Sequence, residues 1–423
     1  MQALLVLYMV KYLLLPGRIE HVWMLGALQK LFGGLEGQPL ASAIFGAYTS
    51  LVYVTPILGG LVADRLLGRR RTVLLGAITM AIGHFLMAVE AAFLLGLLCL
   101  ILGTGLFKGN IASQVGGLYG ENDNRRADAF QIFYLGINAG VIASPLIVGT
   151  LGEKVGWHWG FGAAGVGMLI GLAVYVGGRR HLPADPPLRR GGRKQRAPLT
   201  PAERKRAIAL LLLLPVMAIA VIPNDQIFNA YMVWGDSRFD LEFFGRRLPT
   251  TWLVTLDAIV SVSFLAGVAL FWRWWGKSHR EPDELGKILI GSLFSVSGML
   301  VLAFASATTP EGGRIGLALP VLFHVLNSIG FANILPVSLA LFARVAPPSL
   351  NATAIRLYYL AFAAGNWMVG QIGGLFSTMD TTSFWLLHAG IALASGAGFL
   401  LFRVVVWNRQ APGKGLQADA PSA

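Results

Sequence analysis

A lysine inside an apolar segment is the side chain with the clearest chemical potential in this sequence. Lys108 stands in the stretch GTGLFKGN, within an apolar run from Ala91 to Tyr119. A charged side chain near the centre of a bilayer costs about 2.5 to 3.5 kcal/mol, so such residues usually face a cavity or a partner. Roughly two to three helical turns of 5.4 Å separate Lys108 from the nearer end of the run. We therefore expect a functional lysine; the alternative is a snorkelling lysine whose stem reaches the headgroups.

The composition is that of a polytopic helical membrane protein. Of the 423 residues, 55% are hydrophobic and only 13% are charged, and the mean hydropathy is +0.63. These values exclude a soluble globular chain. The net charge of +13 comes from arginines that cluster in short loops. The positive-inside rule explains them without nucleic acid as a partner, and it predicts an inner (plasma) membrane protein with both termini in the cytoplasm.

The sequence lacks the motifs of enzymes and metal sites. Cys99 is the single cysteine, which excludes an internal disulfide and a cysteine-based metal site. No Walker loop, nicotinamide fingerprint, zinc triad or nucleophile elbow is present. We therefore predict a protein that is not an enzyme and that holds no metal and no cofactor.

Apolar segments predict twelve spans in two groups of six. Residues 1–15 would form a helix of only about 22 Å, against about 30 Å of hydrocarbon, so we expect the first span to be truncated at its start. Residues 17–39 suit an interfacial segment better than a span. The other spans of the first group are predicted at residues 41–63, 72–94, 95–118, 127–151 and 159–176.

A proline-rich basic loop separates the two groups. Its composition cannot bury a core and predicts a cytoplasmic linker, with contact to anionic lipid as a further possibility. The second group is predicted at residues 207–233, 252–272, 288–306, 317–342, 354–376 and 384–406. We therefore predict two six-helix bundles, 1–178 and 207–406, a linker, 179–206, and a cytoplasmic tail, 407–423. This all-α plan is typical of the major facilitator fold, whose substrate site lies near the midplane between the halves.

The loop after the second span carries a recognisable motif, GGLVADRLLGRRRTV. Glycines allow helices to approach closely, an aspartate can cap the next helix or pair across the loop, and arginines complement helix ends. The motif resembles the signature loop of the major facilitator superfamily, and a transport role follows by that resemblance. Its marker residues here are Gly60, Asp64, Arg65, Gly68 and Arg69.

Four further stretches resemble one family within that superfamily, the proton-dependent oligopeptide transporters. They are YVTPILGGLVADRLLG, GTGLFKGN, FQIFYLGINAG and LPVSLALFARVAP, spread in order along most of the chain. The resemblance implies that Lys108 pairs with first-helix carboxylates or takes part in proton coupling. It also implies that Tyr53 and Asn138 line a peptide site. The alternative for these two is an interhelical hydrogen bond, worth about 0.6 kcal/mol each.

This chain departs from the family pattern at several places. In the family, the acids of the first helix pair with this lysine, and their expected position falls before the first residue of this sequence. The tenth-helix glutamate that receives the peptide amino group falls at Phe331, with Asn333 nearby. A seventh-helix glutamate is replaced by Asp225, a shorter acid to which we assign a gating or proton-coupling role.

Asp257 is an added acid, at a position where the family has an asparagine. One hypothesis is that it replaces the acid lost at Phe331 and binds the substrate amino group. The alternative is a helix N-terminal charge in the first turns of its span. His324 is interpreted as a histidine hydrogen-bonded to a neighbour, with proton transfer as the alternative.

These observations predict a secondary active transporter that imports di- or tripeptides, or peptide-like compounds, with protons as the coupling ion. We expect a monomer. Two alternatives stay open: a major facilitator transporter of another small amphipathic metabolite or drug, and a degenerate member that acts as a receptor or assembly partner without transport.

Overall fold

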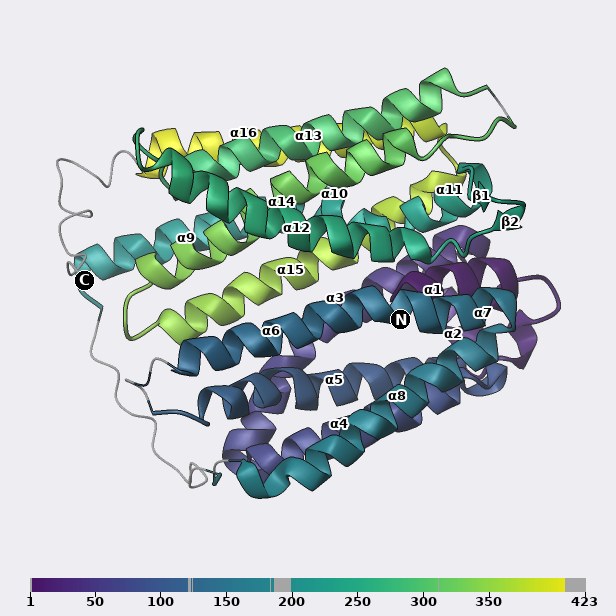
Figure 1. Cartoon of the computed structure of the whole chain (residues 1–423), viewed down its shortest axis with the longest axis horizontal. Coiled ribbons are helices and arrows are strands. Elements are labelled where there is room, and N and C mark those ends of the chain that lie inside the picture. The colour runs from purple at the N-terminus through teal and green to yellow at the C-terminus, as the bar shows by residue number, and fades with distance from the viewer. Residues whose placement is uncertain are drawn as a thin grey trace.

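The computed structural model describes residues 2–120, 123, 125–182, 184–185, 199–310 and 312–407. Nearly all of these residues form long helices that run side by side along the longest axis (Figure 1). The helices form two bundles, one from the first half of the chain and one from the second half (Figure 1). Half of the predicted linker and the tail beyond residue 407 lie outside the described residues.

The first bundle contains α1 and the helices that follow it up to the linker. The long helices are α3 (Gly37–Val62), α4 (Arg69–Met87), α5 (Phe93–Gly116), α6 (Arg125–Ser144) and α8 (Trp157–Gly178). The short ones are α1 (Gln2–Tyr8), α2 (Leu25–Leu31) and α7 (Thr150–Lys154). Tight or wide helical turns extend or link them: Met9–Leu13, Ile19–His21, Ala63–Leu67, Glu90–Ala92, Pro145–Gly149 and Arg179–His181.

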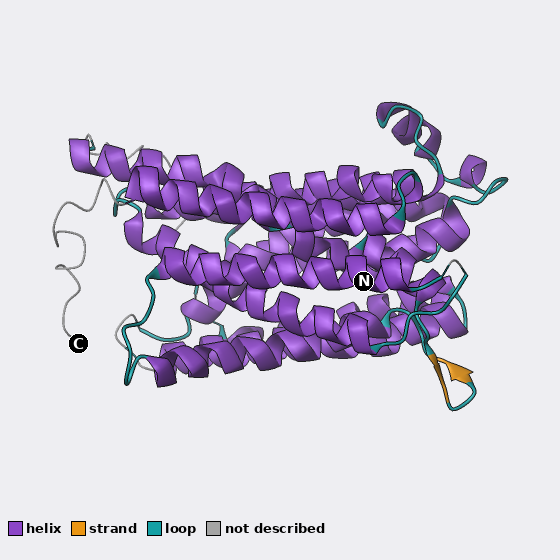
Figure 2. Cartoon of the chain, turned by 90° about the horizontal axis from the view of Figure 1, so that it is seen from above, coloured by secondary structure: helices purple, strands orange, loops and turns teal. Residues whose placement is uncertain are grey.

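The second bundle repeats this plan and adds a small hairpin. Its helices are α9 (Pro201–Ala220), α10 (Ile222–Asp225), α11 (Ala230–Arg238), α12 (Trp252–Trp275), α13 (Glu284–Thr308), α14 (Ala318–Val345), α15 (Asn351–Gly373) and α16 (Thr381–Phe402). Helical turns cover Gln226–Phe228, Gly374–Ser377 and Arg403–Trp407. The strands β1 (Glu242–Phe243) and β2 (Arg246–Arg247) pair in antiparallel register and project from one end of the molecule (Figure 2).

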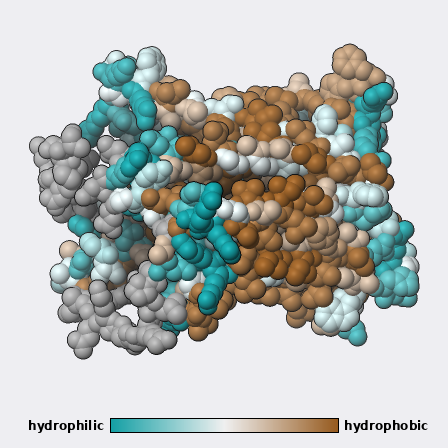
Figure 3. Space-filling view, turned by 60° about the horizontal axis from the view of Figure 1, so that its bottom comes forward, coloured by the Kyte–Doolittle hydropathy of each residue, from teal (hydrophilic) through white to brown (hydrophobic). Residues whose placement is uncertain are grey.

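Nine helical segments within the described residues are long and apolar enough to cross a membrane. The helices α4, with 19 residues, and α15, with 23 residues, also run through the bundles, but they carry arginines and are less apolar. The short α1 lies within the first predicted span, and the count of twelve spans stays a prediction. On the face shown in Figure 3, apolar side chains form a broad brown area across the middle of the molecule, with hydrophilic groups toward both ends. This is the surface that a lipid bilayer requires.

Two predicted boundaries are wrong. We predicted a break near residue 94, but α4 ends at Met87 and α5 begins at Phe93. The reason is Glu90, whose carboxylate accepts hydrogen bonds from Tyr12 at 2.6 Å and Arg18 at 3.1 Å at the end of the bundle. The linker was predicted to extend to residue 206, but α9 begins at Pro201. Thr200 and Glu203 form a capping box there, which satisfies the free N–H groups of the first turn.

The break predicted inside the seventh span is confirmed. The helix α9 ends at Ala220, and the short α10 and a tight turn separate it from α11. Pro223 lies at the start of α10, where a missing N–H is tolerated but a continuous helix is not favoured. The break places the polar side chains of Asn224 and Asp225, both half-buried, beside α14 and α15.

Glycines bring α5 into close contact with two neighbouring helices. A Cβ atom on Gly105 would lie 2.6 Å from the Cβ of Thr55 on α3, and one on Gly103 would lie 2.9 Å from the carbonyl oxygen of Gly76 on α4. Thr55 also donates a hydrogen bond to the Ile101 carbonyl at 3.0 Å. Because Gly105 fixes this crossing, Lys108 is held less than one turn further along α5, facing α3.

The motif loop lies at the end of the molecule that carries the arginine-rich loops, which we call the basic end. Gly68 adopts a φ of +79°, and a Cβ there would lie 2.5 Å from Asp185. The Asp185 carboxylate accepts from the Arg70 backbone N–H at 3.1 Å. We expected Asp64 to cap α4 or to pair across the loop, but Asp185 has that position, and Asp64 has no hydrogen-bond partner among the described residues.

We predict that Gly105→Ala destabilises the protein while Gly109→Ala does not. The added methyl at 105 clashes with Thr55, whereas nothing lies within 4 Å of the equivalent position at 109. Overpacking of this kind costs about 1 to 3 kcal/mol. In a mild detergent, the thermal unfolding temperature of Gly105→Ala should fall and that of Gly109→Ala should stay or rise slightly. Equal temperatures for the two variants would contradict the close contact.

Candidate functional site

Tyr53 and Lys108 meet at the seam between the two bundles. The Lys108 Nζ atom lies 5.0 Å from the centroid of the Tyr53 ring, within range of a cation–π contact. The Tyr53 ring also lies 5.8 Å from Phe362 and 6.5 Å from Tyr359, both on α15 of the second bundle. Among the described residues Lys108 has no hydrogen bond and no ion pair. Its ammonium group is therefore available to an anionic group from outside the protein.

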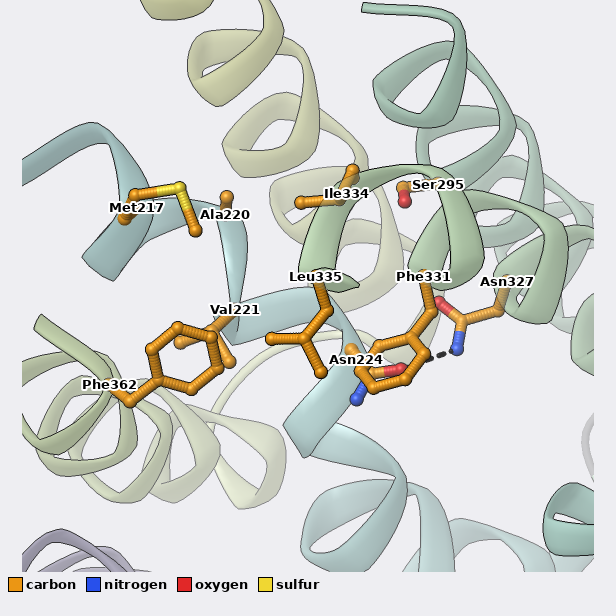
Figure 4. A pocket seen from close by; sticks show the side chains of 10 residues that line it. All are labelled: Met217, Ala220, Val221, Asn224, Ser295, Asn327, Phe331, Ile334, Leu335 and Phe362. Carbon is orange, nitrogen blue, oxygen red and sulfur yellow. Dashed lines mark hydrogen bonds between the residues drawn. The ribbon is translucent and has the colours of Figure 1, made fainter. Parts of the chain in front are cut away.

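A small cavity continues the site into the second bundle (Figure 4). Phe331 from α14 and Asn224 from α10 lie beside each other at its wall, and Phe362 forms its other side. Since Phe362 contacts both the cavity and the Tyr53 ring, it connects the two parts of the site. The lining as a whole is mostly apolar: Met217, Ala220, Val221, Asn224, Ser295, Asn327, Phe331, Ile334, Leu335 and Phe362.

Asp225 stands at the broken helix beside this cavity, held by neutral amides. Its Oδ1 accepts from the Asn224 side chain at 3.1 Å, and its Oδ2 accepts from Asn366 at 2.8 Å. Asn327 in turn donates to the Asn224 oxygen at 2.9 Å. No cation pairs with Asp225 among the described residues. A carboxylate whose hydrogen-bond donors are all neutral has no cation to balance its charge, so it can take up a proton or bind an ammonium group.

Asp257 is neither a helix N-terminal charge nor free. The helix α12 begins at Trp252 and has no acid in its first turn. The Asp257 Oδ1 atom lies 2.9 Å from Nδ1 of His324 on α14, and its side chain is 13% exposed. The prediction that His324 hydrogen-bonds to a neighbour is confirmed. The prediction that Asp257 binds a substrate amino group stays a prediction, and it competes with this pairing.

The remaining predicted residues fall in different surroundings. Phe331 lines the cavity, as predicted for a site-facing position. Asn333 does not, because it is buried and accepts from Trp272 at 2.8 Å while donating to the Ile329 carbonyl at 2.9 Å. Asn138 is half-buried and donates to the Tyr134 carbonyl of its own helix at 2.8 Å. Neither asparagine lines the cavity.

Three polar residues of the site escaped the sequence analysis. Asn224, Asn327 and Asn366 all lie in apolar segments; Asn224 and Asn366 donate to Asp225, and Asn327 donates to Asn224. The rarity of asparagine in membrane spans is a signal that could have found them. What the sequence did not contain was their proximity, because they come from α10, α14 and α15.

The two bundles are fastened to each other at the end opposite the basic end, which we call the distal end. Glu153 of the first bundle accepts from the backbone N–H groups of Thr250 and Thr251, both at 2.8 Å, and so caps α12 of the second bundle. Lys11 forms an ion pair with Asp236 at 2.9 Å. Ionised acceptors at a helix N-terminus are among the stronger hydrogen bonds of proteins.

No hydrogen bond or ion pair between described residues joins the bundles near the basic end. Deeper contacts of the distal half include Ser42 with Asn229 at 2.9 Å and Thr255 with the Ile142 carbonyl at 3.0 Å. Below them the bundles meet through the aromatic rings of Tyr53 and Tyr359. The seam is therefore closed by polar contacts on the distal side of the site and lacks them on the basic side.

A helical membrane protein with two bundles around a polar central seam has the architecture of a major facilitator transporter. The family model PTR2, described as the POT family, matches residues 70–197 and 193–387. The chain therefore belongs to the POT family. The predicted resemblance to proton-dependent oligopeptide transporters is confirmed at the level of the family.

Relatives of known sequence and structure agree. The uncharacterized transporter YclF of Bacillus subtilis (strain 168) is 30% identical over 430 residues, which cover 86% of this chain and 85% of the relative. The peptide transporter YePEPT of Yersinia enterocolitica subsp. palearctica is 28% identical over 453 residues, covering 90% and 88%. A crystal structure of a peptide transporter POT in complex with alafosfalin has a TM-score of 0.81 at 26% identity, covering 97% of this chain and 94% of that chain.

We predict that Glu153→Gln weakens the closed distal end. The variant loses the charge of an acceptor that caps α12, and one hydrogen bond to a charged group contributes about 1.5 to 3 kcal/mol, a shift of roughly tenfold or more toward opening. Spin labels at Val155 and Leu375, both exposed at the distal end, report the separation of the bundles in a Cys99→Ser background. A longer-distance population should grow in Glu153→Gln.

The control is Glu242→Gln on the exposed strand β1, which removes a nearby charge without touching the seam. It should leave the distance distribution unchanged. Identical distributions for all three proteins would show that Glu153 does not hold the distal end closed.

Proposed function

We propose that this protein is a secondary active transporter that imports di- or tripeptides, or peptide-like compounds, together with protons. The single observation that carries the proposal is the seam itself. Among the described residues, it brings a cation with no hydrogen bond or ion pair, Lys108, and an acid with no cationic partner, Asp225, to the two sides of one site in a protein of the POT family. A small peptide carries the two complementary charges and amide groups between them.

The chemistry of each group suits one part of such a substrate. The Lys108 ammonium group would receive the carboxylate, with Tyr53 holding the lysine in place through its ring. Asn224 and Asn327 offer neutral donors and acceptors for the peptide amide. Asp225 would receive the amino group or the coupling proton, and it lies within electrostatic range of Tyr53. Asp257 has a weaker claim to the amino group because His324 already occupies one of its oxygens.

Alternating access supplies the cycle. The bundles would rock about the site, so that the distal contacts around Glu153 open while the basic end closes. Protonation of an intramembrane acid would shift the equilibrium between the two arrangements of the bundles. The size of the shift equals the difference in proton affinity between these two arrangements. The proton is the coupling ion, and we propose no other cofactor. The basic end would face the cytoplasm, with both termini, in a monomer of the inner membrane.

A second cargo remains a candidate because of Phe331. Its ring stands in the cavity wall where an acid would hold a substrate amino group, and the rest of the lining is mostly apolar. That favours a compound with a carboxylate and an apolar end over a charged amino terminus. The related structure with bound alafosfalin supports peptide-like cargo in this family. The third candidate, a receptor without transport, predicts no uptake of any compound.

The test is uptake of labelled dipeptide into proteoliposomes under an inward proton gradient. We expect Lys108→Ala to reduce the initial rate by about tenfold or more, because a charge-assisted hydrogen bond contributes about 1.5 to 3 kcal/mol. Lys30→Ala is the matched control, since Lys30 is an exposed lysine of the short α2 and should transport normally. Collapse of the gradient with an ionophore should abolish accumulation.

Full uptake by Lys108→Ala would remove the proposed role of the lysine. Uptake of other carboxylates but not of peptides would move the proposal to the second cargo. No uptake of any compound by the folded protein would favour the receptor.

A further inference from the structure

A buried chain of three polar side chains crosses the second bundle near α12. The Asp257 Oδ1 atom of α12 lies 2.9 Å from Nδ1 of His324 on α14, and Nε2 of the same histidine lies 2.9 Å from the Tyr231 hydroxyl on α11. His324 and Tyr231 are fully buried, while the Asp257 side chain keeps 13% exposure. Water can therefore reach the Asp257 end of this row of three side chains, but it cannot reach His324.

The surroundings of this chain contain no compensating cation among the described residues. Asp225 of α10, itself an acid, is within electrostatic range of Asp257. His388 of α16 is bound to Gln226, and Trp385 separates it from Tyr231. The charged residues of α13 and α6 lie in their first turns near the basic end: Glu284, Lys287, Arg125, Arg126 and Asp128. Arg273 and Arg344 stand in the last turns of α12 and α14.

These contacts favour two protonation states that differ by one proton. With Asp257 ionised, Nδ1–H of a neutral His324 donates to it, and Nε2 accepts from the Tyr231 hydroxyl. This state carries a net charge of −1 away from bulk water. One added proton, entering at the exposed carboxylate, cancels that charge and stays shared within the pair as a carboxylic acid or an imidazolium. In the imidazolium form Nε2–H donates to the tyrosine oxygen, and the tyrosine O–H then has no acceptor among the described residues.

The pair lies next to a contact that changes when the bundles move. Thr255, on the same helix and two residues before Asp257, donates to the Ile142 carbonyl of the first bundle at 3.0 Å. Glu153 of the first bundle holds the start of that helix. One turn further on, Ser261 hydrogen-bonds to Ser328 at 3.0 Å and continues the polar contact between α12 and α14. A change of charge at Asp257 therefore acts on the helix that closes the distal end.

We propose that Asp257 and His324, with Tyr231 as the positioning residue, form a proton-binding site of the second bundle that is distinct from Lys108 and Asp225. The proposal rests on the proposed function in one respect: it makes this proton one that couples transport to the gradient. The protonated, neutral pair stabilises the contact between α12 and α14 seen in this structure. The pair with a charge of −1 favours the entry of water and a change in how these two helices pack.

The first experiment does not depend on transport. Infrared difference spectra of the whole protein in lipid, recorded between acidic and alkaline pH, should contain a signal from a buried group that takes up one proton. We expect Asp257→Asn and His324→Gln each to remove or shift this signal. His388→Gln, the matched control, changes another buried histidine of the same bundle and should leave it in place. Unchanged spectra in both test variants would overturn the site.

The second experiment separates coupling from binding. A gradient of about one pH unit corresponds to about 1.36 kcal/mol, so one coupled proton supports up to about tenfold accumulation. We expect His324→Gln to lose this accumulation but to retain exchange of labelled for unlabelled dipeptide across the membrane, which needs no net proton movement. Normal accumulation in His324→Gln would overturn the coupling role.

The two readouts keep the proposals apart. If the wild-type protein neither exchanges nor accumulates dipeptide, the proposed function fails, and the infrared spectra still decide whether Asp257 and His324 bind a proton. If His324→Gln does not fold, Asp257→Asn gives the same two measurements, and normal accumulation by Asp257→Asn would equally overturn the coupling role.

Discussion

The cost of charge in hydrocarbon governs where the functional groups of this protein lie. A charged side chain that faced lipid near the bilayer centre would lose several kcal/mol, so Lys108, Asp225 and Asp257 are all placed in the seam or inside a bundle. Each of these three charged groups has a different kind of neighbour that stabilises it. Lys108 lies over an aromatic ring, Asp225 is held by asparagine amides, and Asp257 is joined to a histidine. The middle of the face shown in Figure 3 is mostly apolar.

Close helix packing makes these placements possible. Lipid tails provide no hydrophobic drive to bring helices together, so small residues and hydrogen bonds set their distances. Gly103 and Gly105 allow α5 to touch α4 and α3, and this contact fixes the direction of Lys108. Between the bundles, Gly46 and Gly370 approach in the same way, since a Cβ on Gly46 would lie 2.5 Å from the Cα of Gly370. The backbones of α3 and α15 therefore come into direct contact at this point.

The polar contacts between the two bundles lie toward the distal end, and the described residues near the basic end make none. The two ends of the seam are therefore held together differently. On the distal side Glu153 caps a helix of the other bundle, and Lys11 pairs with Asp236. The carboxylate of Glu153 and the N-terminus of α12 attract each other only while the bundles stay close. The helix that bears this contact also bears Asp257. The helix α12 therefore carries both the acid Asp257 and the contact with Glu153 that joins the two bundles.

The sequence by itself determined the class of fold, the break in the seventh span and the family, because apolar segment lengths, arginine placement and short motifs are local properties. It also singled out Lys108, as a charge inside an apolar segment, and Tyr53 and Phe331, through the resemblance to the family pattern. Only the tertiary structure decided the partners. The amide cluster around Asp225, the pairing of Asp257 with His324, and the burial of Asn333 against Trp272 each join helices that are distant in sequence. Periodicity states which residues share a face, but the neighbour of that face is set by packing of the whole bundle.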